Sequence, residues 1–394
     1  MMALPLIYNI RNLLVRKVST LLTVAGIAMA VGVLLVMLML SHGLKHALVK
    51  NGSADNAIVL RKNSQTETMS GLNRDSVAVI KTAPEIAAGP DGRPLVTSEA
   101  VVGVNLLRRG MVGARSGSNV TVRGIDSGSL ALRSQVRIVE GRAPVPGNAE
   151  VIAGVNASKG FQGCELGGTI PMGGLDWKVV GVFEAAGSGF ESELWGDGEL
   201  LMQAFGREGG FSSVTFRMKD AALDLAALAA RFDSDRRLNV EVVRETEYYE
   251  RSSEALTMLI NILGTVLVVL FSIGAVMGAM VTMFAFVGSR TVEIGTLRAL
   301  GFRRTSILAC FIVESILLAL AGGVAACVPA LLIQRFTFST TNFTTFTDVT
   351  WHFRASPSII VTGLIFALLM GALGGLIPAI RAARLPIITA LREA

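Results

Sequence analysis

The sequence predicts an α-helical membrane protein with four transmembrane helices and a large α+β extracytoplasmic domain. Four runs are apolar enough and long enough to cross a hydrocarbon core, which takes roughly 20 helical residues. A segment with nearly equal numbers of acidic and basic residues, 45–254, separates the first run from the second. Basic residues gather beside the ends of the runs, and this bias predicts how the chain is oriented in a membrane.

The four apolar runs are residues 18–44, 255–289, 305–334 and 355–380. The first, second and fourth contain no Asp, Glu, Lys or Arg, and the third contains one acid, Glu314. Each run is expected to be a helix, because a backbone inside lipid must satisfy its own hydrogen bonds. The first run is too long for the apolar part of a signal peptide, and no small-residue cleavage site follows it, so we interpret it as an uncleaved anchor.

Charge predicts the orientation of these helices. Segments 1–17, 290–304 and 381–394 hold ten basic residues against two acidic ones, a net charge of +8. Residues 45–254 hold 24 Lys and Arg against 26 Asp and Glu, a net charge of −2. Because basic flanks stay in the cytoplasm, these three segments are predicted to be cytoplasmic, and 45–254 and a short loop at 335–354 to be external. The isoelectric point near 9.5 thus reflects topology and does not indicate nucleic-acid binding.

Two segments beside the membrane each allow two interpretations. Residues 1–17 are mildly amphipathic and either lie along the inner membrane surface or extend the first helix inward. Residues 241–254 are charged, lack Gly and Pro, and lead directly into the second apolar run. We expect a helix there that continues into the membrane, with a flexible stalk as the alternative.

The external segment 45–254 has a strand–helix–strand pattern at each end. The first pattern covers residues 57–106 and the second covers residues 213–243. Residues 107–206 between them are rich in Gly and in short β-like runs. We expect the two ends to pack together as an α+β subdomain and the middle to form an inserted β-rich subdomain. Cys164 is the only cysteine of this segment, so no intrachain disulfide is available to it.

The sequence contains no pattern typical of an enzyme's active site. It has no Walker A sequence for ATP, and the Gly pairs of the external segment lack the strand–helix context of a nucleotide-binding loop. His42 and His46 have the i, i+4 spacing of a metal-binding pair, but no HExxH pattern surrounds them. We interpret them as polar residues at the membrane edge, and we predict no catalytic residue, cofactor site or metal site on this chain.

The segment 290–304 is unlike an ordinary loop between two membrane helices. Four of its fifteen residues are arginine, and only Glu293 opposes them. Its apolar residues recur at helical spacing, which predicts a helix that docks on a soluble cytoplasmic partner. The residues predicted to form this docking helix are Val292, Glu293, Ile294, Gly295, Leu297, Arg298, Ala299, Leu300, Gly301 and Phe302.

Glu314 is a charge inside a predicted membrane helix. Intramembrane charges are costly and often functional. Because Glu314 lies about ten residues from the inner end of its run, we expect it to face Arg303, Arg304 or the interior of the helix bundle. A structural or coupling role is favoured over a proton or substrate role.

Small residues recur at four-residue spacing in two of the runs. Gly274 and Gly278 do so in the second run, and Gly371 and Gly375 in the fourth. Such spacing allows close helix packing, including packing between two copies of a chain. Gly274 and Gly278 are the candidates for a dimer interface.

Together these features resemble the MacB/FtsX-like permeases, which are the membrane subunits of the type VII ABC systems. The resemblance covers nearly the whole chain: one span, a large outer domain and three further spans. Its most specific pieces are residues 289–304, 311–323 and 375–383 in the membrane part, and 139–142, 150–152 and 179–183 in the outer domain.

The resemblance implies a fold and a set of partners. The fold is a homodimer of four-helix subunits whose outer domain has a porter-like α+β part and an inserted β-rich part. A separate ATPase dimer, which carries the ATP and magnesium, would grip residues 290–304 and move the outer domains through the membrane helices. MacB carries an ATPase domain on its own chain and this sequence does not. A periplasmic adaptor protein and an outer-membrane channel are the further partners that the resemblance suggests.

Two functions agree with this resemblance. The first is ATP-driven export, from a bacterial inner membrane, of an amphipathic molecule, a peptide or a lipid-linked cargo, with lipoprotein release like that of the LolC/LolE pair as a variant. The second is an FtsX-like signalling scaffold that activates an outer partner such as a cell-wall hydrolase. The large two-part outer domain favours the first.

Overall fold

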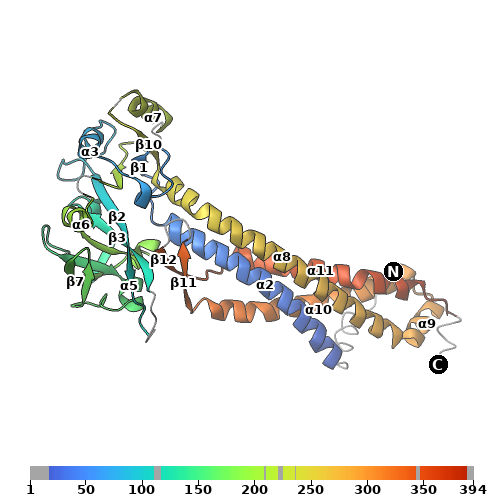
Figure 1. The fold of residues 1–394 in the computed structure, drawn as a ribbon. Helices are drawn as coiled ribbons and strands as arrows, with labels where there is room; N and C mark the ends of the chain where they lie inside the picture. The colour runs from blue at the N-terminus through green and yellow to red at the C-terminus, as the bar shows by residue number, and fades with distance from the viewer. Residues whose placement is uncertain are drawn as a thin grey trace. The chain divides into compact units, whose positions relative to one another are not determined.

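The computed structural model describes residues 17–110, 117–207, 210–220, 225–235, 237–342 and 347–387. Nearly all of the predicted amphipathic segment 1–17, and the end of the predicted tail 381–394, lie outside these residues. The chain divides into two compact units (Figure 1). The globular unit consists of Gly43–Thr257 and Thr337–His352, and the helical unit consists of the other described residues.

The helical unit contains four helices that are long and apolar enough to cross a membrane, which confirms the predicted fold class. They are α2 (Lys17–Val49), α8 (Glu245–Gly288), α10 (Arg304–Ile333) and α11 (Pro357–Arg384). A short helix, α9 (Thr291–Ala299), lies between α8 and α10. The globular unit includes the end of α2 from Gly43 onward and the start of α8 up to Thr257.

The helix α8 is uninterrupted over 44 residues, so the structure has a helix and not a stalk before the second apolar run. It begins at Glu245 and not at residue 241, because residues 241–244 complete a strand, β10 (Val240–Arg244). A backbone in which every residue adds an internal hydrogen bond resists bending, and no Gly or Pro interrupts the first five turns.

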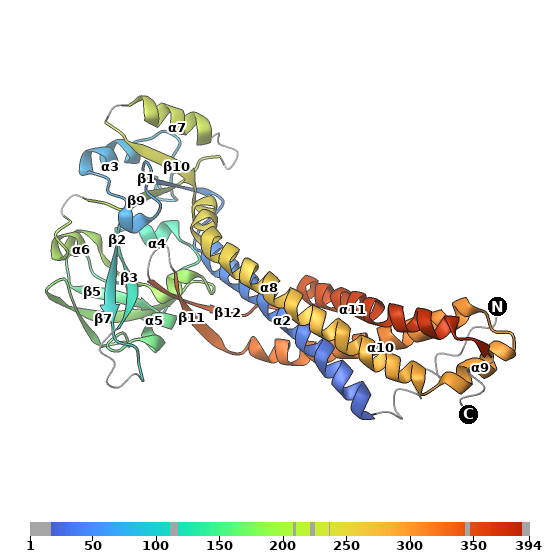
Figure 2. The same cartoon turned by 45° about the vertical axis from the view of Figure 1, so that its right-hand side comes forward.

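The two ends of the external segment form one antiparallel arrangement, the α+β lobe. Its strand order is β10, β1 (Asn56–Arg61), β9 (Ser213–Arg217) and β2 (Val96–Leu106), so strands from the two ends alternate. The helices α3 (Arg74–Lys81) and α7 (Leu225–Ser234) belong to this lobe (Figure 2). Their side chains Val77 and Phe232 share one core with Val59 of β1.

Strand β1 shows why a strand of this lobe can have a nearly continuous apolar sequence. Successive strand residues point to opposite faces of a sheet. Val59 packs in the core beneath α3 and α7, whereas Ile58 and Leu60 pack on the other face against Tyr248 and Tyr249 of α8. Because both faces of the sheet are covered, alternation between apolar and polar residues is lost.

The middle of the external segment forms the β-rich lobe, which continues the same sheet. Strand β2 belongs to both lobes, because residues 96–99 pair with β9 and residues 100–106 pair with β3. The change of lobe therefore lies within β2, a few residues before position 107. The remaining strands follow in the order β3 (Ser118–Ile125), β8 (Leu194–Asp197), β5 (Glu150–Gly154), β7 (Leu175–Glu184) and β4 (Arg137–Gly141), with β6 (Thr169–Met172) also on β7.

Short helices cover the β-rich lobe: α4 (Ser129–Leu132), α5 (Val155–Gly160) and α6 (Gly198–Ala204). Two 3-10 helices, η1 (Glu67–Met69) and η2 (Gly189–Ser192), complete the globular unit. Trp177 and Leu194 are fully buried in the core of the β-rich lobe beside Cys164. Burial raises the pKa of the Cys164 thiol to about 12, so this cysteine behaves as a small apolar residue.

The predicted short external loop 335–354 contains a β-hairpin. Its strands are β11 (Thr337–Asn342) and β12 (Thr347–His352), paired antiparallel with Thr337 opposite His352. Thr and aromatic residues dominate both strands, and these residue types favour a pleated backbone. The hairpin is part of the globular unit, although it connects α10 to α11 in the sequence.

Candidate functional site

The predicted docking segment folds as helix α9 and a closing turn. The helix covers residues 291–299 and not the whole of 290–304. Leu297 accepts from Phe302 N–H at 3.1 Å, and Arg298 accepts from Gly301 N–H at 3.2 Å. This is the Schellman arrangement, which needs a left-handed residue just past the helix, and Gly301 supplies it with φ +94°. Leu300, Gly301 and Phe302 therefore form the turn into α10.

One face of α9 is anchored in the helical unit. Ile294 is buried and packs with Met283 and Phe286 of α8 and with Ile307 and Phe311 of α10. Gly295 beside it is also buried. The anchor holds α9 against the ends of both neighbouring helices, so a force applied to α9 acts on α8 and α10 together.

The opposite face of α9 is exposed and carries apolar side chains. Val292 is 38% exposed and Leu300 is 71% exposed. Glu293, Thr296 and Ala299 are exposed beside them, whereas Leu297 and Arg298 are partly covered. The exposed positions follow the i, i+4, i+8 spacing of one helix face. We call Val292, Thr296, Ala299 and Leu300 the outward face of α9.

Glu314 pairs with Arg290 and not with either predicted partner. An Arg290 Nη1–Glu314 Oε2 distance of 3.0 Å joins the N-cap residue of α9 to the middle of α10. The Glu314 side chain is fully buried and that of Arg290 is 10% exposed. Of the three surroundings expected for Glu314, the structure has the interior of the helix bundle, and Arg303 and Arg304 are not its partners because ten residues of helix rise about 15 Å. Those arginines lie at the start of α10, about three turns away, and the partner of Glu314 is Arg290 instead.

The two glycine pairs have different surroundings within the helical unit. A Cβ at Gly371 would lie 2.5 Å from the Cβ of Ala319, and one at Gly375 would lie 2.5 Å from the Cβ of Ser315. Ser315 Oγ also donates to the carbonyl of Gly371 at 2.7 Å. The small residues of α11 therefore serve close packing against α10 in the same chain.

Gly274 and Gly278 instead border open space. A Cβ added at either position would meet no atom within 4 Å. Both line a hollow of about 280 Å³ between α2 and α8, together with Gly26 and Thr23 of α2. Within the described part of the chain the hollow leaves room at both glycines, so Gly274 and Gly278 remain candidates for contact with a second copy.

The contrast between these glycines gives a direct prediction. Gly375→Leu is expected to destabilise the helical unit by about 1–3 kcal/mol or more, because the larger side chain must force α10 and α11 apart. Gly278→Leu should leave the monomer folded and membrane-inserted. The amount of each variant recovered as a monodisperse species in mild detergent measures the difference. Equal recovery of both variants would contradict the packing seen at Gly375.

The globular unit contains a buried ion cluster that the sequence did not indicate. Its members are charged side chains that are each at most 10% exposed: Glu67, Glu99, Arg123, Arg133, Glu193 and Glu245. Arg123 binds Glu67 at 2.9 Å, Glu99 at 2.8 Å and Glu193 at 2.8 Å. One guanidinium thereby joins η1, β2 and the residue that precedes β8, which come from both lobes.

Arg133 extends the cluster to the start of α8. It binds Glu99 at 2.5 Å and lies 3.5 Å from Glu245, the first residue of α8. The second distance is longer than a hydrogen bond. Glu245 also accepts from Ser53 N–H and from Asn56 Nδ2, both at 2.9 Å. The first turn of the long helix is thus tied to the connection that follows α2.

The carboxylates of the cluster do not share one electrostatic environment. Burial alone would raise the pKa of Glu67, but the charge and hydrogen bonds of Arg123 outweigh it and hold that pKa below its usual value. Burial raises the pKa of Glu245, and Arg133 offsets this only in part. Two arginines face four carboxylates in the cluster. The negative charge of Glu245, which lies 3.5 Å from Arg133, is therefore compensated least.

The 3-10 helix η2 brings the same region together with the hairpin. Phe190 N–H donates to Asn51 Oδ1 at 3.1 Å, and the Phe190 ring packs edge-on against Tyr249 of α8 at 6.0 Å. Ser192 Oγ accepts from Thr350 N–H of β12 at 3.0 Å. Within the globular unit, η2 therefore contacts the residues next to α2, the start of α8 and the hairpin between α10 and α11.

Two family models match the chain. The model described as the MacB-like periplasmic core domain matches residues 20–234, and the model described as the FtsX-like permease C-terminal domain matches residues 265–387. The first match covers 215 of 394 residues, more than half of the chain. The second covers the part of α8 from residue 265 onward and all of α9, α10 and α11.

Several curated proteins are similar in sequence. Macrolide export ATP-binding/permease protein MacB 1 of Aeromonas hydrophila is 29% identical over 242 residues, which are 58% of this chain and 35% of that protein. The chain thus spans about a third of the length of this relative. The uncharacterized ABC transporter permease YknZ of Bacillus subtilis is 25% identical over 422 residues, which cover 99% of this chain and 100% of that protein.

Two solved structures align with about half of this chain at low similarity. The periplasmic region of MacB from Actinobacillus actinomycetemcomitans has a TM-score of 0.38 and 13% identity, and the alignment covers 52% of this chain and 95% of that one. The extracellular domain of YknZ has a TM-score of 0.34 and 16% identity, with 48% and 99% covered. The family models, which together cover most of the chain, carry the assignment: the chain belongs to the MacB/FtsX-like family of ABC transporter permeases.

Proposed function

We propose that this chain is the membrane-spanning subunit of an ABC transporter and that it passes the work of a separate ATPase to its globular unit. The observation that carries the proposal is the division of α9 into two faces. Ile294 anchors the helix on α8 and α10, while Val292 and Leu300 present apolar surface outward. A short helix with this division suits a docking element that is pushed by a partner.

The outward face of α9 has the composition of a small protein–protein contact. Its apolar centre is bordered by charged side chains, Glu293 on the helix and Arg303 and Arg304 after it. An apolar centre with a polar rim is the usual anatomy of an interface. The matching surface on the ATPase would be an apolar groove with acidic residues at its edge.

The proposal places ATP and magnesium on the ATPase and not on this chain. No Walker A sequence occurs in these 394 residues. YknZ, which matches along its whole length, is described as a permease. The MacB relatives are described as ATP-binding and permease proteins, and this chain matches only part of them.

Force would travel from α9 through contacts within each unit and along the backbone of α8. The Arg290–Glu314 pair and Ile294 tie the α9 region to α8 and α10. Helix α8 then continues without a break to Glu245, where the buried ion cluster begins. The cluster joins both lobes of the globular unit, so displacement of α8 would be felt by both.

The charge of the segments beside the membrane helices supports the proposed orientation of the chain, and the open space beside α8 supports its proposed assembly. The basic segments support an orientation with both termini and α9 in the cytoplasm and the globular unit in the periplasm of an inner membrane. The hollow that includes Gly274 and Gly278 would receive α8 of a second copy, which makes the working unit a homodimer. A periplasmic adaptor and an outer-membrane channel complete the proposed export path.

We propose export of an amphipathic molecule, a peptide or a lipid-linked cargo as the activity. The MacB relatives are described as macrolide exporters, and macrolides are amphipathic. Activation of a cell-wall hydrolase and release of lipoproteins remain the alternatives, and neither is favoured by a contact in the structure. The globular unit would act on the cargo, which need not cross the bilayer.

The test replaces the two exposed apolar residues of α9. Val292→Asp with Leu300→Asp is expected to lower the ATPase activity of the purified transporter complex at least tenfold, because two charges would be buried unpaired at the contact. Tenfold corresponds to about 1.4 kcal/mol of lost coupling. The ATPase assay in lipid nanodiscs, with equal amounts of both subunits, measures the effect.

A matched control places the same charges elsewhere. Val139→Asp with Leu166→Asp alters two exposed apolar residues of the globular unit: Val139 is 38% exposed, as Val292 is, and Leu166 is 45% exposed. This control should retain the activity of the unaltered complex. Normal ATPase activity in the α9 variant, with normal membrane insertion, would show that α9 does not dock the ATPase.

A further inference from the structure

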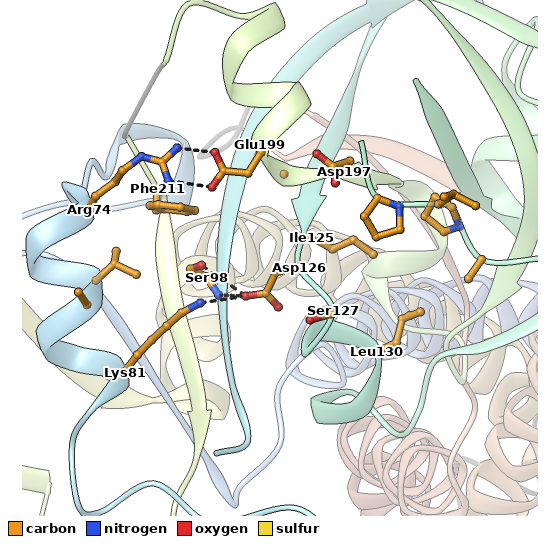
Figure 3. Close-up of a pocket in the computed structure, with 17 residues that line it drawn as sticks. Arg74, Lys81, Ser98, Ile125, Asp126, Ser127, Leu130, Asp197, Glu199 and Phe211 are labelled. Carbon is orange, nitrogen blue, oxygen red and sulfur yellow. Dashed lines mark hydrogen bonds and ion pairs between the residues drawn. The ribbon is translucent and has the colours of Figure 1, made fainter. Parts of the chain in front are cut away.

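A cleft of about 690 Å³ lies between the two lobes of the globular unit (Figure 3). Helix α3 of the α+β lobe forms one wall through Arg74, Val77, Ala78 and Lys81, which share one helix face. The loop at residues 143–146 forms the opposite wall. Cavities of 300–1,000 Å³ with mainly apolar walls and a few polar groups are typical of small-molecule sites.

The walls of this cleft combine apolar surface with paired charges. Phe211, Ile125, Val145 and two prolines supply apolar surface. Lys81 pairs with Asp126 at 3.1 Å, and Arg74 pairs with Glu199 of α6 through both of its terminal nitrogens (Figure 3). Both pairs join α3 of the α+β lobe to residues of the β-rich lobe.

The carboxylates of the cleft differ in how firmly they are held. Asp126 accepts from the backbone of Ser98 and Gly128 in addition to Lys81, and these contacts fix it in place. Asp197 accepts from two backbone N–H groups, at Leu200 and Gly147. Glu199 is held by the side chain of Arg74, and both of these side chains are more than half exposed. Exposed pairs of this kind contribute little to stability, so Glu199 can exchange its partner readily.

Arg74 places a positive charge at this corner of the cleft, beside Glu199 and Phe211. Its guanidinium lies 5.6 Å from the centre of the Phe211 ring while it contacts Glu199. A carboxylate beside an aromatic face is a favourable site for a cation. Because Arg74 is long and exposed, a ligand's ammonium group can take its position when the arginine turns away into water.

The charges of the cleft exclude two other ligand classes. Three carboxylates, Asp126, Asp197 and Glu199, face two cations, Arg74 and Lys81, which disfavours an anion. A fatty acyl chain would leave these five charged groups facing hydrocarbon, which costs free energy unless they are hydrated. A ligand with an apolar body and a single positive charge matches both the apolar surface and the excess negative charge of the cleft.

We propose that this cleft binds an amphipathic organic cation, with its apolar body against Ile125, Val145 and Phe211 and its positive group at Glu199 in place of Arg74. The arginine acts as an internal occupant that competes with the ligand. Removal of Arg74 should therefore strengthen binding, whereas removal of the Glu199 charge should weaken it. A site that simply attracts apolar molecules would respond to neither change.

The test follows protection of a cysteine placed in the cleft of the full chain in lipid nanodiscs. Ala78→Cys provides an exposed thiol in the cleft wall, and Asp91→Cys provides an exposed thiol elsewhere on the globular unit. The probe is rhodamine 6G, an amphipathic cation, and 8-anilinonaphthalene-1-sulfonate is the matched amphipathic anion. The rate of modification by a water-soluble maleimide is measured by mass spectrometry, with the reactivity of the chain's own cysteines subtracted.

Rhodamine 6G is expected to slow modification at position 78 at least fivefold and to leave position 91 unchanged. Arg74→Ala should lower the half-protecting concentration about threefold to tenfold, and Glu199→Gln should raise it at least tenfold. The proposal is overturned if rhodamine 6G gives no protection, if the anionic probe protects equally well, or if Arg74→Ala weakens protection. The assay needs no ATPase, so its failure would leave the proposed function untouched.

Discussion

Arg123→Ala is expected to unfold the globular unit at or near physiological temperature. Arg123 is almost fully buried and binds three buried carboxylates, Glu67, Glu99 and Glu193. Removing one partner of a buried ion pair typically costs 3–5 kcal/mol, because the remaining charge is left uncompensated. Whole domains are stable by only about 5–15 kcal/mol, so this single change removes a large share of the total.

Tryptophan fluorescence can follow this unfolding in the intact chain. The three tryptophans of the sequence, Trp177, Trp195 and Trp351, all belong to the globular unit. Trp195 donates to Glu193 Oε2 at 2.7 Å and so lies at the ion cluster. For a unit of this size we expect the midpoint of thermal unfolding to fall by roughly 10 °C or more.

Arg137→Ala is the matched control for Arg123. Arg137 is 78% exposed and lies 3.6 Å from Glu184, so it too has a carboxylate partner but remains in water. Exposed pairs are worth about 0–1 kcal/mol, and the midpoint should hardly move. Equal midpoints for the two variants would mean that the buried cluster contributes no more than an exposed pair.

Arg290→Ala should disrupt the helical unit, and a second substitution should repair it. The variant leaves the fully buried carboxylate of Glu314 without its partner at 3.0 Å, at a cost of about 3–5 kcal/mol. Glu314→Gln alone should cost less, because a neutral amide needs no counter-charge. The double variant Arg290→Met with Glu314→Leu replaces both charges by apolar groups of similar size and should recover most of the loss.

Recovery of monodisperse protein from membranes in mild detergent, with and without heating, is measured for the unaltered chain, for Arg290→Met, for Glu314→Leu and for their combination, and these are the four values of a double-mutant cycle. Residues in direct contact show interaction energies of about 0.5–3 kcal/mol in such cycles. Arg298→Ala, at a partly covered position on α9, serves as the control for loss of an arginine. If the double variant is no better than Arg290→Ala, the ion pair does not explain the burial of Glu314.

The sequence was sufficient for features that depend on local composition. Apolar runs of membrane length gave four helices, because the bilayer imposes both their length and their internal hydrogen bonding. The alternating patterns at 57–106 and 213–243 gave strands and helices that do occur there. The hairpin at 337–352 was also within reach, since its Thr-rich alternation is a strand signal.

Features that depend on which side chains meet were out of reach. Glu67 and Glu245 are 178 positions apart and approach one another only because strands from both ends of the external segment enter one sheet. Likewise, the spacing of Val292, Ile294 and Leu300 predicted a helix but could not tell which residues face inward. For Glu314, helix rise alone argues against Arg303 and Arg304, but only the packing of α8 beside α10 identifies Arg290.

The proposed function depends on docking of an ATPase on the outward face of α9. It can be tested by placing the photo-crosslinking residue p-benzoylphenylalanine at positions 292, 296, 299 and 300 in living cells, with position 139 of the globular unit as the control. We expect adducts at the four α9 positions that contain one protein with a Walker A sequence, identified by mass spectrometry, and no such adduct at position 139. Absence of that protein from all four adducts, or its presence at position 139, would exclude docking of an ATPase on α9.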